Sequence, residues 1–283
     1  MGKKVILTAD STCDLSPALK ERFQVTTMPL HVILNGKEYL DGVDLQPDDI
    51  LNAYAREKSL PKTAAINASE YQEFFKPFLD DGCEVVHVNI AGALSLSHGS
   101  CQSAAKELGN VYPVDSCSLS TGSGQLLLHA RDLIDRGLPA KEVAEALAKM
   151  TKRIQASFVI DSLEFLYKGG RCSALAMLGA NMLRLKPCIE VHNSDGSMGV
   201  GKKYRGAFES VLLKYCQDKL GQAEVDGRYA FITHAGVAPE LLESIKEHVL
   251  SYNLFKEVFI TRAGCTITAH CGRNTLGVLF LNK

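Results

Sequence analysis

Some segments of this chain have the pattern of apolar residues that is typical of strands, and the segments between them have the pattern typical of helices. Short apolar runs at Val5–Ala9, 84–90 and 111–115 predict buried strands. Between the first two runs, apolar side chains recur at the spacing of one helix face, at Tyr71, Phe74, Phe75, Phe78 and Leu79. The pattern therefore indicates alternating strands and helices, and the aromatic face is interpreted as core packing.

Local signals place further elements in the first half of the chain. A helix is expected over Leu15–Phe23, introduced by a capping region at Ser11 and Asp14. Asn35-Gly36 predicts a hairpin turn between an extended Val25–Leu34 segment and a return strand. Asn67-Ala-Ser-Glu70 has the spacing of a capping box. The other helices expected here cover 47–58, a segment from Ser97 onward, 120–136 and 140–154.

A second series begins at the strand-like Ser157–Ile160. Asp195-Gly196 predicts a turn that joins two strands. The remaining expected elements are helices over 163–168, 173–184, 207–220 and 239–251, and strands over 187–191, 198–204, 229–233, 257–261 and 275–281.

Repeated βα units predict two α/β domains with mainly parallel sheets covered by helices. Because no Pro/Ser-rich linker interrupts the chain, the boundary is expected at a short crossing between packed domains, near 150–156. This gives an N-terminal domain over 1–153 and a C-terminal domain over 154–283. A ligand tunnel is expected at or near their interface.

Composition excludes some classes of function. The 283 residues are 46% apolar, and 31 basic against 32 acidic residues leave a net charge of −1. No global field attracts nucleic acid or anionic lipid, so nucleic-acid binding is not expected. The apolar run after Met1–Lys4 is short, and no run approaches membrane-spanning length. We therefore expect no signal peptide, no stable membrane insertion and a cytoplasmic location.

The cysteines do not form a metal-binding or disulfide pattern. An odd, dispersed set in a chain without a signal peptide predicts reduced thiols. None of the eight histidines lies three or four residues from another, as in a helical zinc site, so no metal or other cofactor is expected. The nine cysteines are Cys13, Cys83, Cys101, Cys117, Cys172, Cys188, Cys216, Cys265 and Cys271.

Known catalytic motifs are largely missing. No Gly-x-Ser-x-Gly nucleophile elbow occurs. Residues 196–202 fit most of a phosphate-binding loop, but Lys203 stands at the required Ser/Thr position and a strand-like segment follows. Gly122-Ser123-Gly124 lacks the third glycine of a dinucleotide fingerprint. The sequence therefore assigns no catalytic residue.

The most informative segment is the uncharged run from Asn89 to Ala105, which follows the strand-like Glu84–Val88. Small residues allow close approach of a ligand, and a Ser-rich turn that leads into a helix offers N–H and O–H donors. This arrangement suits a carboxylate or a phosphate. A tight βα turn with an N-cap serine explains the same residues, and both interpretations stay open.

Several motifs together resemble the DegV family of fatty-acid-binding proteins. The resemblance is collinear over nearly the whole chain, which makes it more specific than any single motif. Its segments are Ile6-Leu-Thr-Ala-Asp10-Ser-Thr-Cys-Asp14-Leu, Met28-Pro-Leu, Asn35-Gly-Lys-Glu-Tyr39-Leu-Asp41-Gly, Gly92-Ala-Leu-Ser95-Leu-Ser97, Val114-Asp115-Ser116, Lys168-Gly-Gly-Arg171-Cys-Ser173, Lys186-Pro187, Asp195-Gly196 leading to Arg205, and Gly264, His270-Cys-Gly272 and Gly277.

This resemblance implies a lipid carrier and not an enzyme. Members of the family hold one long-chain fatty acid between two α/β domains, and in some bacteria they present its carboxylate to a separate fatty acid kinase. By resemblance, Thr63 and Ser95 hold the carboxylate, and Arg171 and His270 lie near the head group. Simpler structural roles remain: a turn or cap for Thr63 and Ser95, a helix cap for Arg171, and a structural histidine for His270.

Two segments depart from the family pattern. Members often have Ser-Gln-Pro-Ser after the threonine, where this chain has Ala64-Ala-Ile-Asn67. Members also have Gly-Pro-Gly after the histidine, where this chain has Cys271-Gly-Arg273. The first departure bears on the shape of the carboxylate pocket. The second places a cation at a usually rigid turn and bears on presentation to a kinase.

Two other classes of function stay open. His270 and Arg171 suit an enzyme that acts on an acyl or phosphoryl group, although no recognisable nucleophile and base accompany them. Lys202-Lys203-Tyr204-Arg205 is a basic cluster that suits either an acidic protein partner or a solvated strand edge. No segment presents an obvious unpaired apolar face, so a monomer is expected.

Overall fold

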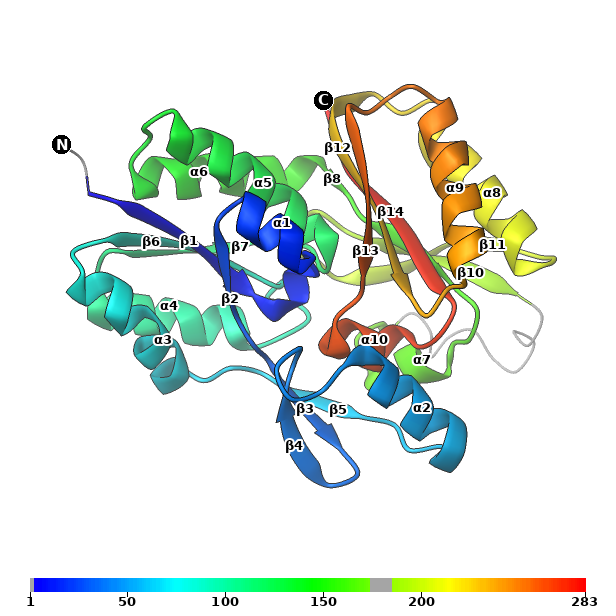
Figure 1. Ribbon diagram of the computed structural model, residues 1–283, viewed down its shortest axis with the longest axis horizontal. Coiled ribbons are helices and arrows are strands. Elements are labelled where there is room, and N and C mark those ends of the chain that lie inside the picture. Colours follow the sequence, from blue (N-terminus) through cyan, green and yellow to red (C-terminus); the bar gives the residue numbers. More distant parts are fainter. Residues whose placement is uncertain (1–2, 174–184) are drawn as a thin grey trace.

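The computed structural model describes residues 3–173 and 185–283, and it consists of two helix-covered sheets side by side with a small third sheet below them (Figure 1). The α/β class expected from the sequence is confirmed. The helix expected over 173–184 falls, apart from Ser173, outside the described residues. No helix in the described part of the chain is long and apolar enough to cross a membrane.

The first sheet is entirely parallel, as expected, with strand order β2-β1-β6-β7. Buried side chains of α3 and α4 pack on one face, and those of α1, α5 and α6 pack on the other. The elements of this region are β1 (Val5–Asp10), η1 (Ser11–Cys13), α1 (Pro17–Arg22), β2 (Val25–Met28), α3 (Ala68–Asp80), β6 (Glu84–Asn89), α4 (Ser97–Leu108), β7 (Val111–Asp115), α5 (Thr121–Asp135) and α6 (Ala140–Met150).

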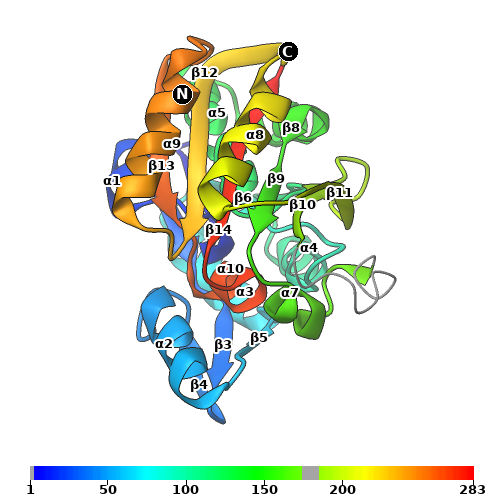
Figure 2. The same cartoon turned by 90° about the vertical axis from the view of Figure 1, so that its right-hand side faces the viewer.

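The second, seven-stranded sheet does not follow the parallel expectation, because only β12 and β13 pair in parallel. Strands β10 and β11 form an antiparallel hairpin, and the last strand, β14, lies antiparallel to both β9 and β12. Helices α8 and α9 cover its outer face (Figure 2). Its elements are η2 (Thr151–Arg153), β8 (Ile154–Gln155), β9 (Ser157–Ile160), β10 (Lys186–Val191), β11 (Met198–Tyr204), α8 (Phe208–Leu220), β12 (Val225–Ala235), α9 (Pro239–Ser251), β13 (Glu257–Arg262) and β14 (Thr275–Asn282).

A small antiparallel sheet, ordered β4-β3-β5, packs against three helices. Asn35 and Gly36 form its hairpin turn as expected, and both have positive φ, 52° and 77°. Helix α10 and strands β5 and β8 were not expected from the sequence. The elements here are β3 (His31–Leu34), β4 (Lys37–Leu40), α2 (Pro47–Glu57), β5 (Lys62–Ala64), α7 (Glu164–Gly169) and α10 (Cys265–Cys271).

Helix α5 lies between the two large sheets. All of its residues from Thr121 to Ala130 are buried, and one apolar core combines residues of both halves of the chain. The side-chain amide of Gln125 donates to the backbone carbonyls of Tyr229 and Leu279. The two sheets therefore share an interior.

Of the caps expected for helices α3 and α1, only the one for α3 forms as expected. The capping box is confirmed, because the Glu70 backbone N–H donates to Asn67 and the Asn67 backbone N–H donates to Glu70. The expected capping of α1 by Ser11 and Asp14 is wrong, since Ser16 accepts the capping hydrogen bond. Ser11 and Asp14 instead bond to groups far away in the sequence.

Candidate functional site

The Ser-rich turn after β6 leads directly into α4. The Ser95 hydroxyl oxygen accepts a hydrogen bond from the Ser97 backbone N–H and lies 2.9 Å from the Ser97 hydroxyl oxygen. Ser97 is fully buried, whereas Ser95 is half-buried. The turn thus has the local capping role that its residues allow, and it keeps one hydroxyl partly accessible.

Thr63 and His270, separated by 207 residues in the sequence, form a direct hydrogen bond. Thr63 lies on β5, and its hydroxyl oxygen is 2.9 Å from the Nε2 atom of His270 at the end of α10. The hydroxyl and the imidazole are therefore coupled, and the tautomer decides which group donates.

His270 is half-buried in a close-fitting position. A Cβ atom at Gly169 would lie 2.3 Å from its Nδ1 atom, so only glycine permits this approach. Burial, and secondarily the positive charge of Arg171, lowers the pKa of His270 to about 4. The ring is therefore neutral at neutral pH.

Arg171 lies beside His270 with its guanidinium exposed. It donates to the carbonyl of Gly169 at 2.8 Å and to that of Leu94 at 3.5 Å. Within the described residues it forms no ion pair with an acidic side chain. Its charge is therefore available to an anion at this position.

All four residues singled out for the head group line one cavity of about 170 Å³, which we call the polar mouth. Both halves of the chain contribute to it, as expected for a ligand tunnel at their interface. Its lining residues are Leu30, Thr63, Ala64, Ala65, Ile90, Leu94, Ser95, Leu96, Leu119, Arg171, Met198, Thr266, Ile267 and His270.

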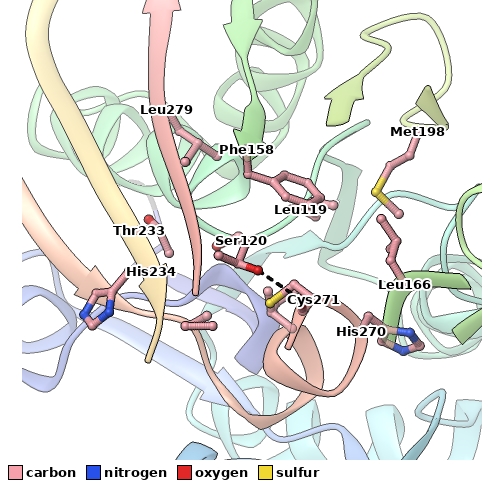
Figure 3. Close-up of a pocket in the computed structure, with 15 residues that line it drawn as sticks. Leu119, Ser120, Phe158, Leu166, Met198, Thr233, His234, His270, Cys271 and Leu279 are labelled. Carbon is pink, nitrogen blue, oxygen red and sulfur yellow. Dashed lines mark hydrogen bonds between the residues drawn. The ribbon is translucent and has the colours of Figure 1, made fainter. Parts of the chain in front are cut away.

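A second cavity of about 50 Å³, which we call the apolar chamber, adjoins the polar mouth. In Figure 3, Phe158 lies next to Leu119, and Leu166 stands between Met198 and His270, so side chains of different elements line the same space. Four side chains line both cavities, namely Leu119, Met198, Ile267 and His270. The polar mouth thus borders a nearly apolar cavity, with these four side chains between or beside them.

No local sequence pattern marks most of the residues that line the chamber. Ile267 lies one helical turn before His270, so its role would have followed from predicting α10. Leu119 lies just after the Val114-Asp115-Ser116 motif. It is followed by Ser120, which has a positive φ of 52°, a backbone state that costs energy for a non-glycine residue.

Lys203 and Arg205 line neither cavity. Both are exposed on or next to β11, whereas the intervening Tyr204 is buried, as strand alternation requires. Lys202 pairs with Asp218 at 2.6 Å. The basic cluster is therefore a surface feature that is separate from the polar mouth.

The two departures from the family pattern have distinct places. Ala64 and Ala65 form part of the wall of the polar mouth, while Asn67 caps α3. Arg273 is exposed and follows Gly272, which has a φ of 70°. The first departure therefore touches the cavity directly.

Metal-binding groups do not gather in the described part of the chain. No three His, Cys, Asp or Glu side chains there are placed to hold a metal ion. Eight of the nine cysteines are buried, and Cys117 is half-buried.

Comparison with known proteins agrees with this architecture. A DegV domain-containing protein of Clostridium perfringens is 27% identical over 283 residues, which cover 99% of both chains. The structure of a DegV family protein from Thermus thermophilus, described by its fatty acid binding, has a TM-score of 0.88 at 26% identity and covers 99% of this chain and 100% of that one. DegV from Bacillus subtilis, described as a fatty acid binding protein, shares the fold with a TM-score of 0.85 at 23% identity, with full coverage of both chains.

The profile described as "Uncharacterised protein, DegV family" matches residues 4–283. The motifs that suggested this relationship thus lie within a match to nearly the whole sequence. The chain belongs to the DegV family.

Proposed function

We propose that this protein binds one long-chain fatty acid, with the carboxylate in the polar mouth and the acyl chain in the apolar chamber. The observation that carries this proposal is the convergence of Thr63, Ser95, Arg171 and His270 on one cavity that adjoins an apolar one. The similar Thermus thermophilus protein, described by its fatty acid binding, supports the same ligand class.

Thr63 and Ser95 serve as the hydroxyl donors to the carboxylate. Nδ1 of His270 is buried and has no hydrogen-bond partner among the described residues, so a proton is better placed on Nε2. Nε2–H then donates to Thr63, and the Thr63 hydroxyl proton is free for the ligand. Arg171 adds positive charge at the same cavity.

Affinity and orientation come from different parts of the ligand. Burial of the acyl chain contributes about 0.8 kcal/mol per methylene group. Each hydrogen bond to the ionised head group adds about 1.5–3 kcal/mol. An unpaired carboxylate in the apolar chamber would be costly. The carboxylate therefore stays in the polar mouth, and the acyl chain of the fatty acid enters the chamber.

The properties of His270 fit a lipid carrier better than an enzyme. The Thr63–His270 contact has the geometry of a nucleophile and a base, but a base also needs an orienting partner and a suitable pKa. No group orients Nδ1 in the described residues, and the lowered pKa makes the imidazole a weak base.

We further propose a partner protein, a cellular location and a role for each domain. The carrier works in the cytoplasm and presents the bound carboxylate to a fatty acid kinase, with exposed Lys203 and Arg205 at the docking surface. Residues 1–153 carry Thr63 and Ser95, and residues 154–283 carry Arg171 and His270 and close over the ligand.

Native mass spectrometry before and after denaturation tests the ligand class. We expect a co-purifying mass in the fatty-acid range, and stoichiometric binding of palmitate by delipidated protein. Failure of the delipidated protein to bind palmitate or oleate contradicts the proposal. A co-purifying nucleotide, or turnover of an acyl phosphate, favours the enzyme alternative.

A further inference from the structure

Two buried aspartates from the N-terminal half meet the beginning of α10. The Asp41 carboxylate accepts hydrogen bonds from the backbone N–H groups of Cys265 at 2.7 Å and Thr266 at 3.2 Å. Asp14 accepts from the backbone N–H of Gly264 at 2.9 Å. Both aspartates are 5% exposed. Three consecutive N–H groups, those of the N-cap residue Gly264 and of the first two residues of α10, are thus bound by aspartates far away in the sequence.

Each of the two aspartates also accepts a hydrogen bond from a serine hydroxyl group. Ser11 donates to Asp41 at 2.9 Å, and Ser120 donates to Asp14 at 2.5 Å. A Cβ atom at Gly264 would lie 3.1 Å from an Asp14 oxygen and 3.2 Å from an Asp41 oxygen. The two carboxylates therefore converge on one point of the backbone, and glycine allows that approach.

Helix α10 depends on these external contacts for its position. It has seven residues, too few for a stable isolated helix. Its first turn is tied to Asp14 and Asp41, and its end places His270 against Thr63. Asp41 follows β4 and Thr63 lies on β5, so the same small sheet provides contacts at both ends of the helix.

Buried carboxylates are an expensive way to cap a short helix. Burial, and secondarily repulsion from Asp41, raises the pKa of Asp14 to about 8. At neutral pH Asp14 is therefore mostly a neutral carboxylic acid, which still accepts from the Gly264 N–H with one oxygen. The Asp41 side chain accepts on both oxygens, so it fixes one orientation of the Cys265 and Thr266 N–H groups. Precise placement of α10 is a functional reason for this arrangement.

We propose that Asp14 and Asp41 are positioning residues of the ligand site, which hold α10 so that His270 stays against Thr63 in the polar mouth. The expected effect of these aspartates on ligand binding rests on the proposed function, whereas their expected effect on His270 does not. It assigns a role to the Asp10–Asp14 and Tyr39–Gly42 motifs, whose aspartates lie outside both cavities.

The test uses Asp41→Asn in the full-length protein. The amide still accepts one hydrogen bond, but its NH₂ group opposes one of its present donors, so the first turn of α10 shifts. We expect the pKa of His270, followed by NMR titration, to rise from about 4 toward 6.5. The preference for palmitate over methyl palmitate should fall about tenfold, while affinity for the ester changes less than about twofold.

Asp44→Asn is the matched control, because Asp44 is an exposed carboxylate of the same loop that accepts from the Leu40 N–H and from no N–H group of α10 within the described residues. It should change neither measurement. A folded Asp41→Asn protein with wild-type His270 titration and wild-type acid preference overturns the inference.

If Asp41→Asn does not fold, Gly264→Ala takes its place. The added methyl group displaces both carboxylates by only a few tenths of an ångström, so the same changes are expected at smaller size. No change in either measurement overturns the inference. If wild-type protein binds no palmitate, the proposed function fails, and the His270 titration alone decides whether Asp41 positions α10.

Discussion

The polar mouth and the apolar chamber share four side chains but differ in what their remaining walls offer. The polar mouth has hydroxyls from Thr63 and Ser95 and the charge of Arg171. The remaining chamber wall comes mostly from strand and helix positions, including Phe158 and Leu279 of the shared core. The difference separates two tasks: one region recognises the head group, and the other provides space for the acyl chain. Each should therefore fail independently of the other.

The largest effect is expected from filling the chamber. Ala263 is buried and lines the chamber but not the polar mouth. Ala263→Leu adds three carbons to a cavity of about 50 Å³. Palmitate affinity should fall about 100-fold, equivalent to about 2.7 kcal/mol, with a much smaller loss for octanoate. Calorimetric titration with both acids measures this.

Ala148→Leu, the same change at an exposed position on α6, is the control for Ala263→Leu. Its palmitate affinity should equal that of the wild type. An Ala263→Leu protein that keeps wild-type palmitate affinity would show that the acyl chain lies elsewhere.

The next effect concerns the polar mouth. Thr63→Val and Ser95→Ala each remove one hydroxyl donor and should weaken palmitate binding by about 1–3 kcal/mol. The double variant should lose less than the sum, because both donors serve one anion. Methyl palmitate, which keeps the chain without the charge, should bind all variants about equally. Unchanged preference for the acid in the double variant would move the carboxylate site toward Arg171 or His270.

Protonation of His270 is expected to affect the stability of the fold. The pKa of His270 is lowered to about 4 in the folded protein, against 6.5 unperturbed, so its contribution to stability is present above pH 6.5 and lost as the pH falls through 4. From pH 7 to pH 4, this group should cost the wild type about 3 kcal/mol of unfolding free energy. His270→Gln should lack that loss in urea titrations.

His234→Gln is the comparison for His270→Gln. His234 lies on the chamber wall, and burial lowers its pKa to about 4 as well. Its replacement should change the pH dependence of stability in the same way without altering the preference for acid over ester. Loss of that preference in His234→Gln would contradict the division between the two regions.

The smallest effect on ligand is expected outside both regions. Lys203→Glu with Arg205→Glu should change palmitate affinity less than about twofold, because both side chains are exposed and line neither cavity. Association with a fatty acid kinase should weaken and lose its salt dependence. Lys141→Glu with Lys149→Glu on α6 carries the same charge change and should leave association intact. Equal weakening by both pairs would remove the docking role from Lys203 and Arg205.

The sequence was most informative where structure depends on neighbouring residues. The Asn67–Glu70 capping box and the Asn35-Gly36 hairpin need only a few adjacent positions, and both formed as expected. Ser11 and Asp14 misled, because their partners, Asp41 and Gly264, are distant in the chain. Alternating strands and helices also cannot reveal the direction of β14, since pairing depends on contacts between whole elements.

For the candidate site too, the sequence was informative mainly about residues that are neighbours in the chain. Composition and spacing indicated an anion-binding turn near Ser95, but only the family resemblance joined it to Thr63, Arg171 and His270. Helix α10 escaped prediction because Cys265–Cys271 is short and rich in threonine, without charged or capping signals of its own. Most chamber walls come from single side chains of many elements, which no local pattern marks.

The burial of α5 between the two sheets has a consequence for how the molecule melts. Unfolding of either half would disrupt the shared apolar core to which Leu126 and Leu127 of this helix belong. The protein should therefore show one calorimetric transition, with van 't Hoff and calorimetric enthalpies that agree. For the same reason, separation of the halves is a costly route for lipid exchange. Entry and exit are expected to use local openings around the cavity, while the shared interior stays closed.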